Sequence, residues 1–308
     1  MNPAFSVVFF TTIAGAAQGL VIALAFAVLG GVAVDPGFVA DALVVADVML
    51  VIGLAASFGH LGRPERAWRA VLMWRSSWLS REVIVLPAFI GIVALWWLAL
   101  QRGVSTPLVP LAAILGALAL WVCTAMIYAC LRFIQEWAHP LTLVNFTLIG
   151  VASGLVLASA LAAWAGEAGL LRLTGPAAVA ITLFAGATRW LALRRNAALR
   201  PKSTLQSATG IHTPQLVQKS MGMSAGSFNT REFFHGRTLA ALRLVRLGFI
   251  VFGFGLPAGF GLWALMGGGA ATAWTLAVLC QGPGLLAERW FFFAQARHPQ
   301  NLYYQAVS

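Results

Sequence analysis

The sequence is poor in charged residues, and this shortage excludes most soluble classes of protein. Charged side chains make up 9% of the 308 residues, whereas 60% are hydrophobic. Soluble domains average about 25% charged and about 45–50% apolar residues, so no soluble fold of this size could bury the excess of apolar surface. A bilayer accepts it, because its core takes up helices of about 20 apolar residues. We therefore predict an all-α integral membrane protein, a bundle of about eight transmembrane helices.

Cysteine and histidine are also scarce. The three cysteines, Cys123, Cys130 and Cys280, lie in apolar stretches and form no CxxC pair, which argues against a disulfide framework or a cysteine-ligated cluster. The five histidines fall in loops or at the ends of apolar segments: His60, His139, His212, His235 and His298. No two of them face each other from mid-membrane helices, and no P-loop, zinc spacing or nucleophile motif occurs. We expect neither haem nor a metal ion in this protein.

Eight apolar segments are present, and turn residues separate them. They cover roughly residues 5–33, 37–58, 83–101, 107–131, 141–165, 174–193, 242–266 and 270–294. Pro107, Pro140 and Pro176 are expected to open helices, where proline is tolerated. The two longer connections, 59–82 and 194–241, are too short to form an independent domain. We therefore treat 1–308 as a single polytopic membrane domain.

The basic residues indicate how the chain is oriented. With eight spans, both termini lie on one face, called face A here, and only Arg102 and Arg172 fall on the opposite face, face B. By the positive-inside rule, face A and both termini are cytoplasmic, as in a bacterial inner membrane. The first apolar run lacks a basic segment before it and is long, so we expect a retained helix rather than a cleaved signal. The net charge of +11 reflects topology and anionic lipid, not nucleic-acid binding.

The connection after the second segment carries the most informative residues. The stretch SFGHLGRPERAWRAVLMWRSSWLSREV runs from Ser57 to Val83. It places His60 and Glu82 at similar depth on helices adjacent in sequence. A histidine can donate a hydrogen bond or a proton to a quinone near neutral pH, and a carboxylate can relay the accompanying proton. Trp74 and Trp78 could form an apolar wall for the quinone ring.

An ordinary structural interpretation of the same residues stays open. Glu82 could only stabilise a helix N-terminus, with Ser80 as the N-cap, and the tryptophans could belong to an interfacial aromatic belt. Asp47, near the middle of the second segment, is costly in a membrane and should face the bundle interior or water. It is either a proton-path residue or a protonated hydrogen-bonding group.

Two stretches resemble a known family. The start, MNPAFSVVFFTTIAGAAQGL, and the run HLGRPERAWRAVLMWRSSWLSREV are similar to the DmsC family of membrane anchor subunits, which serve dimethyl sulfoxide reductase and related molybdoenzymes. The resemblance covers the whole sequence in length, helix count and loop plan. Its most specific part is the HLG–P…SSWLSRE pattern.

The resemblance implies a function and a set of partners. Family anchors bind a molybdopterin catalytic subunit and a four-cluster ferredoxin-like iron–sulfur subunit, and they exchange electrons between the nearest cluster and a quinone (ubiquinone or menaquinone) without haem of their own. The family's quinol-binding histidine and glutamate match His60 and Glu82, and Arg63 and Arg81 could steer the quinone carbonyl or the partner. A cytoplasmic face A favours the sulfite-oxidising branch of the family, of the SoeABC type.

Three other hypotheses remain. The protein could anchor a terminal reductase of the dimethyl sulfoxide type that oxidises quinol. It could be a purely structural anchor, with quinone chemistry in another subunit. It could also be a secondary transporter, which the embedded Asp47 would suit, although no inverted repeat and no matched pair of broken helices is visible.

Overall fold

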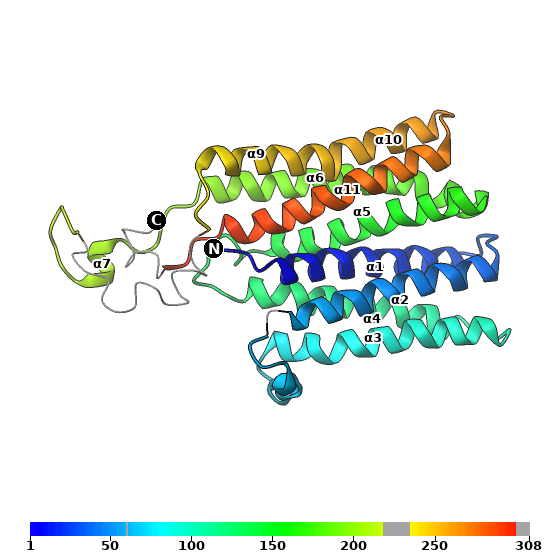
Figure 1. Ribbon diagram of the computed structural model, residues 1–308, viewed down its shortest axis with the longest axis horizontal. Helices are drawn as coiled ribbons and strands as arrows, with labels where there is room; N and C mark the ends of the chain where they lie inside the picture. The colour runs from blue at the N-terminus through cyan, green and yellow to red at the C-terminus, as the bar shows by residue number, and fades with distance from the viewer. Residues whose placement is uncertain (60, 218–234, 300–308) are drawn as a thin grey trace.

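The computed structural model describes residues 1–59, 61–217 and 235–299, and every regular element in these ranges is helical. Eight helical segments among them are long and apolar enough to cross a membrane, which confirms the predicted fold class. They lie side by side along one axis (Figure 1). The spans are α1 (Phe5–Leu29), α2 (Pro36–Phe58), α3 (Trp78–Gln101), α4 (Leu108–Ala129), α5 (Pro140–Ala165), α6 (Ala168–Ala197), the segment Leu239–Leu265, and α11 (Ala270–Ala294).

The seventh span is not a continuous α-helix. It consists of α9 (Leu239–Ile250), a π-helical stretch η3 (Val251–Gly255) and α10 (Leu256–Leu265). The wider π turn lies where Gly253 approaches the backbone of Gly284 on α11. Pro257 then begins the next α-helical turn, where its missing N–H is tolerated. Two short elements lie outside the spans: the 3₁₀-helix η1 (Pro64–Met73) and α7 (Leu205–Thr209).

The largest differences from the predicted boundaries are in α3 and α6. α3 begins at Trp78 instead of residue 83, so Glu82 lies inside the helix. α6 spans Ala168–Ala197 instead of 174–193, because Gly166 ends α5 in the left-handed conformation (φ 77°) and the next helix follows at once. Pro176 therefore lies inside α6 and does not open it, contrary to the prediction.

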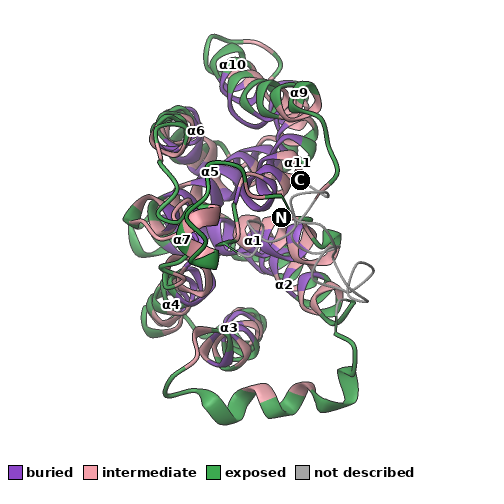
Figure 2. Cartoon of the chain, turned by 90° about the vertical axis from the view of Figure 1, so that its left-hand side faces the viewer, coloured by how far each residue is buried: buried purple, intermediate pink, exposed green. Residues whose placement is uncertain are grey.

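α1 occupies the centre of the bundle, with α2, α4, α5 and α11 packed around it (Figure 2). Its closest neighbour is α5. Gly19 of α1 faces Gly150 and Gly154 of α5 so closely that a Cβ atom at Gly19 or Gly154 would overlap the facing backbone. Small residues that allow two backbones to touch are the usual basis of helix association in lipid.

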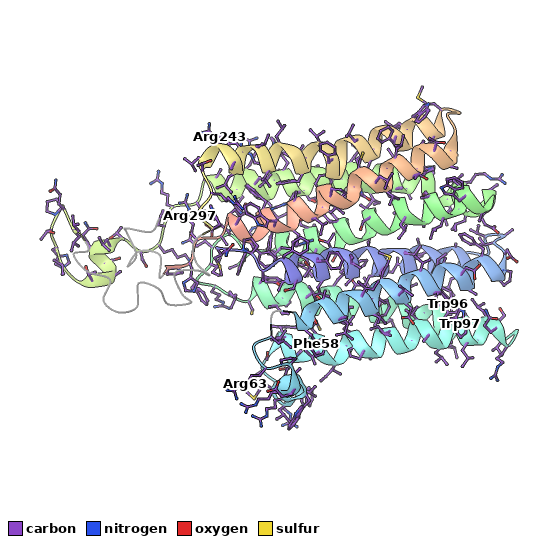
Figure 3. All side chains as sticks on the ribbon, in the orientation of Figure 1. Phe58, Arg63, Trp96, Trp97, Arg243 and Arg297 are labelled. Atoms are coloured by element: carbon purple, nitrogen blue, oxygen red, sulfur yellow. The ribbon has the colours of Figure 1, made fainter. Side chains whose placement is uncertain are left out.

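One end of the bundle carries most of the basic side chains. α1, α3, α5 and α9 begin at this end, and α2, α4, α6 and α11 finish there, so it corresponds to face A. Arg63, Arg243 and Arg297 lie at this end with Phe58, whereas Trp96 and Trp97 lie toward the other (Figure 3). Both η1 and α7 are at the face A end (Figure 1).

Candidate functional site

The first turn of α3 fixes the position of the predicted site residues. Ser77, not Ser80, caps the helix, because the Ser77 Oγ accepts a hydrogen bond from the backbone N of Ser80 at 3.3 Å. Ser80 itself is buried. With the helix beginning at Trp78, Glu82 lies about 6 Å along the axis from the start of the span.

Glu82 points into the bundle. It is 6% exposed, and the Oγ1 of Thr124 on α4 donates a short hydrogen bond to its Oε1. A carboxyl group in the apolar part of a membrane protein is costly, and such residues are kept where they pair, hydrogen-bond or act on protons. An exposed helix N-terminus needs no such burial, so helix stabilisation alone does not account for the position of Glu82.

Arg81 is next to Glu82 in the sequence, but its side chain forms hydrogen bonds with the preceding loop. Its Nε donates to the carbonyl of Trp74 at 3.0 Å and its Nη2 donates to the carbonyl of Arg75 at 2.8 Å. Its guanidinium lies 4.2 Å from the centre of the Trp78 ring, a cation–π distance. Arg81 therefore holds the end of the 59–77 connection against α3, with Trp78 half-buried and Trp74 exposed.

η1 presents further exposed groups at face A. Arg63 precedes it and is exposed, and Pro64 begins it. Trp68, Leu72 and Met73 on this helix are all more than half exposed, and Figure 2 shows η1 lying across the outer side of α3. Large apolar and arginine side chains at the end of a bundle match the membrane interface. His60 lies outside the described residues, between Gly59, which ends α2, and Leu61.

Asp47 is separate from this group. It is half-buried on α2, and its Oδ1 has no hydrogen-bond partner in the described part of the chain. It lies 11 residues before the end of α2, about 16 Å along the axis from face A, whereas Glu82 is about 6 Å from it. The structure thus does not bring Asp47 to the depth of Glu82.

Sequence reasoning missed a buried ion cluster. Glu288 and Arg289 on α11 and Arg189 on α6 are each at most 4% exposed. The Arg189 Nε lies 2.5 Å from the Glu288 Oε1, and the Arg289 Nε lies 3.7 Å from the Glu288 Oε2. The charge count by sequence includes both arginines among the basic residues of face A, but both are buried within spans. Three charges inside apolar segments were the available signal.

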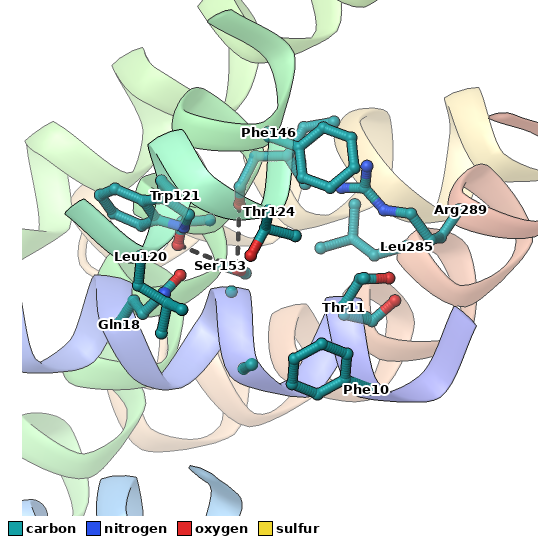
Figure 4. Close-up of a pocket in the computed structure, with 15 residues that line it drawn as sticks. Phe10, Thr11, Gln18, Leu120, Trp121, Thr124, Phe146, Ser153, Leu285 and Arg289 are labelled. Carbon is teal, nitrogen blue, oxygen red and sulfur yellow. Dashed lines mark hydrogen bonds between the residues drawn. The ribbon is translucent and has the colours of Figure 1, made fainter. Parts of the chain in front are cut away.

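Two narrow cavities lie next to these buried charges. The first, which we call cavity 1, lies between α1, α4, α5 and α11. Thr11, Thr124 and Arg289 line it from three different helices (Figure 4). The second, cavity 2, lies between α5, α6 and α11 and includes Asn145 and Arg189. Their volumes, about 20 and 10 Å³, correspond to roughly one water molecule each.

His139 lies at the face A side of cavity 2 and caps α5. Its Nδ1 accepts a hydrogen bond from the backbone N of Leu141 at 3.2 Å. Burial, followed by the positive charge of Arg195, lowers the pKa of His139 from its ordinary value. Both effects favour the neutral ring that the cap requires, because a protonated Nδ1 could not accept this bond.

The described geometry defines a multi-pass helical membrane protein with a protonatable carboxyl group just below one face, and comparisons with known proteins agree with this class. Residues 1–252 match the family of DMSO reductase anchor subunits (DmsC). A sulfite dehydrogenase subunit of Allochromatium vinosum is 48% identical over 328 aligned positions, which span the whole of both proteins.

Two shorter similarities lead to the same family. An anaerobic dimethyl sulfoxide reductase chain of Haemophilus influenzae is 30% identical, over 50% of this chain and 57% of the relative. The anaerobic dimethyl sulfoxide reductase chain YnfH of Escherichia coli is 29% identical, over 37% of this chain and 41% of the relative. The chain belongs to the DMSO reductase anchor subunit family.

Proposed function

We propose that this protein is the quinone-reactive membrane anchor of a multi-subunit molybdoenzyme that oxidises sulfite to sulfate. Membership of the anchor family supports the first part. The second part rests on a relative named as a sulfite dehydrogenase subunit that matches over the full length of both proteins, whereas the named dimethyl sulfoxide reductase chains match half of this chain or less. The proposed quinone site rests on one observation, which is that Glu82 is buried and accepts a hydrogen bond from the Thr124 hydroxyl.

The quinone ring fits outside the bundle better than inside it. The two cavities are each only large enough for about one water molecule. Outside, the exposed Trp74 and the half-buried Trp78 offer apolar ring faces at the start of α3. Arg81 stacks on Trp78 and keeps this surface in place. We propose that the ring lies between η1 and α3, with Arg63 and His60 as further contacts and with the buried Ser80 and Glu82 on the bundle side of it.

Different side chains around this site bind the quinone and transfer protons to it. A bound quinone supplies the acceptor that takes up two electrons and two protons. Glu82 holds a proton at Oε1 or Oε2, passes it to the quinone and is reprotonated from face A, and Thr124 keeps the carboxyl group oriented through its hydroxyl. Trp74 and Trp78 exclude water from one side of the ring. His60 would serve as the hydrogen-bond donor to a quinone oxygen.

The partners are proposed to dock on face A. A four-cluster iron–sulfur subunit would pass single electrons to the quinone site, and a molybdopterin subunit would carry out the sulfur chemistry. The arginines exposed at this end support both an acidic partner surface and a cytoplasmic location. Electrons and protons then enter from the same side, so turnover of this complex alone should generate no membrane potential.

The test is the Glu82→Gln variant in the assembled complex, with sulfite-driven quinone reduction as the readout. Quinone turnover should fall by roughly 10²-fold or more, the usual contribution of a general acid or base, while both partner subunits still copurify with the anchor. His60→Ala should also lower turnover. The matched control is Glu167→Gln, because Glu167 accepts a hydrogen bond from the Asp35 backbone at face B and lies far from the proposed site.

The outcomes separate the competing functions. Normal turnover in both Glu82→Gln and His60→Ala would leave the protein as a structural anchor only. A protein that purifies without partner subunits from several detergents would favour a transporter. A complex that oxidises quinol with dimethyl sulfoxide but does not oxidise sulfite would assign the anchor to a terminal reductase.

A further inference from the structure

Polar groups inside the bundle extend from Glu82 and Thr124 toward α11. Thr124, whose hydroxyl bonds to Glu82, also lines cavity 1. α4 therefore places one hydroxyl between the carboxyl group and an internal space. Thr11 of α1 lines the same space, and Figure 4 shows both threonines and Arg289 of α11 around it.

Cavity 1 has the properties of a hydrated space. It has room for roughly one water molecule. Trp121 lines it, and the indole Nε1 of this residue is buried with no hydrogen-bond partner within the described ranges. Buried polar atoms almost always have a partner, and bound water commonly supplies it. A water molecule in cavity 1 would satisfy Trp121 and lie beside Thr124.

Cavity 2 has the same properties and reaches face A. Asn145 and Arg189 line it, and neither the Oδ1 of Asn145 nor the Nη2 of Arg189 has a hydrogen-bond partner among the residues described. At its outer end lie His139, Glu136 and Arg195, which are all partly exposed. Water can therefore enter cavity 2 from the face A surface.

Arg289 and Phe146 line both cavities and separate them. The guanidinium of Arg289 lies 3.8 Å from the centre of the Phe146 ring. Its positive charge is partly offset by Glu288, whose Oε2 is 3.7 Å from the Arg289 Nε. Arg289 therefore lies at the junction of the two spaces, and its guanidinium carries several N–H donors for water there.

We propose that cavities 1 and 2 form a hydrated proton route from face A to Glu82, with Arg289 between its two halves. This inference rests on the proposed function. When the O–H bond of Glu82 breaks and its proton passes to the quinone oxygen, the Thr124 hydroxyl gives its proton to the carboxylate. Thr124 then takes a proton from water in cavity 1, that water takes one from water in cavity 2, and face A supplies the last proton, while the Arg289 guanidinium stays protonated throughout. Electrons come from the partner's iron–sulfur cluster.

The first test measures water inside the wild-type complex. Radiolytic hydroxyl-radical footprinting oxidises side chains that touch ordered water. Trp121 and Trp274 are similarly buried, at 2% and 1% exposed, but Trp121 lines cavity 1 whereas Trp274 lines neither cavity 1 nor cavity 2. We expect Trp121 to be oxidised at least several-fold faster than Trp274. Equal rates would mean that cavity 1 is dry and would overturn the route.

The second test removes one hydroxyl from the route. Thr124→Val keeps the shape but breaks the link to Glu82, and Asn145→Leu removes the polar group from cavity 2. Sulfite-driven quinone reduction should fall by about 10-fold in each, less than the 10²–10⁴-fold of a lost general acid, and a small weak acid such as formate should restore it. The control is Thr174→Val: Thr174 is fully buried and bonded to Ser159, but lines neither cavity.

The results separate this inference from the proposed function. Slow, acid-rescued turnover in Thr124→Val with normal turnover in Thr174→Val supports the route. If Glu82→Gln is slow but Thr124→Val and Asn145→Leu turn over normally, the route is wrong and the quinone site stands. If Glu82→Gln turns over normally, both are wrong. A Thr124→Val complex that does not assemble leaves the footprinting of the wild-type complex to decide.

Discussion

Single residues at face A set the electrostatics of the protein where the chain enters the membrane. His139 is an example, because it caps α5 with a ring nitrogen and lies beside the Arg195 guanidinium. Only the neutral ring can accept the Leu141 N–H. The folded protein therefore disfavours protonation of His139, and its pKa lies below the ordinary value.

Stability should therefore decrease in acid. As pH falls below about 6.5, the ordinary histidine pKa, the unfolded chain binds a proton at His139 that the folded chain resists, so the free energy of unfolding declines. His139→Asn keeps a capping side chain without a titratable group and should reduce the difference in Tm between pH 7.5 and pH 5.5. His139→Ala should cost about 1 kcal/mol at neutral pH through loss of the cap. An unchanged pH dependence in His139→Asn would contradict this account.

At the scale of elements, the contact between α1 and α5 holds the centre of the bundle together. The facing glycines bring the two backbones into contact, so the association depends on the absence of side chains, not on a hydrophobic driving force between the helices. Cavity 1 lies along this same pair and is lined by Gly15 and Gly150. The crossing therefore also positions the proposed proton route.

A larger side chain at this crossing should separate the helices. In Gly154→Leu, atoms would overlap the Gly19 backbone, and the cost should exceed the 1–3 kcal/mol typical of overpacking, because backbone cannot move aside as a side chain can. The expected result is a lower Tm in detergent and a lower yield of assembled complex. Gly91→Leu is the control, because a Cβ at the exposed Gly91 on α3 meets nothing within 4 Å. Equal Tm values for the two variants would contradict the close crossing.

For the whole molecule, the distribution of charge between the two ends sets the expected orientation. The structure places the ends of the spans so that most exposed arginines of the described residues lie at face A, whereas Arg102 and Arg172 lie at face B. Arg189 and Arg289 do not contribute to this surface, because they are buried in the bundle. The remaining basic residues still favour a cytoplasmic face A.

Labelling of intact cells with a membrane-impermeant maleimide can test this orientation. In a background without the three native cysteines, Ser105→Cys at face B should be labelled and Ser203→Cys at face A should not; both positions are exposed. Both should react after the membrane is permeabilised, which serves as the control. The reverse pattern would place face A outside the cytoplasm and, with it, the proposed partners.

The sequence predicts the spans of this protein and the motif around Glu82, but not every residue that contacts that motif. Hydropathy and turn residues locate all eight spans, with errors at α3 and α6 where a local cap or a left-handed glycine decides the boundary. The motif around Glu82 is also visible in sequence. Thr124 was not predicted, because nothing in its own apolar segment indicates that it faces Glu82.

The class of protein, the number of spans and the sorting of charge follow from the amino-acid order alone, because lipid and water impose these on each segment separately. Packing in three dimensions decides which helix faces meet. In a membrane, both the lipid-facing and the buried sides of a helix are apolar, so periodicity gives little indication of the buried side. The bond between Thr124 and Glu82, the buried cluster around Glu288 and the two cavities therefore arise only from that packing.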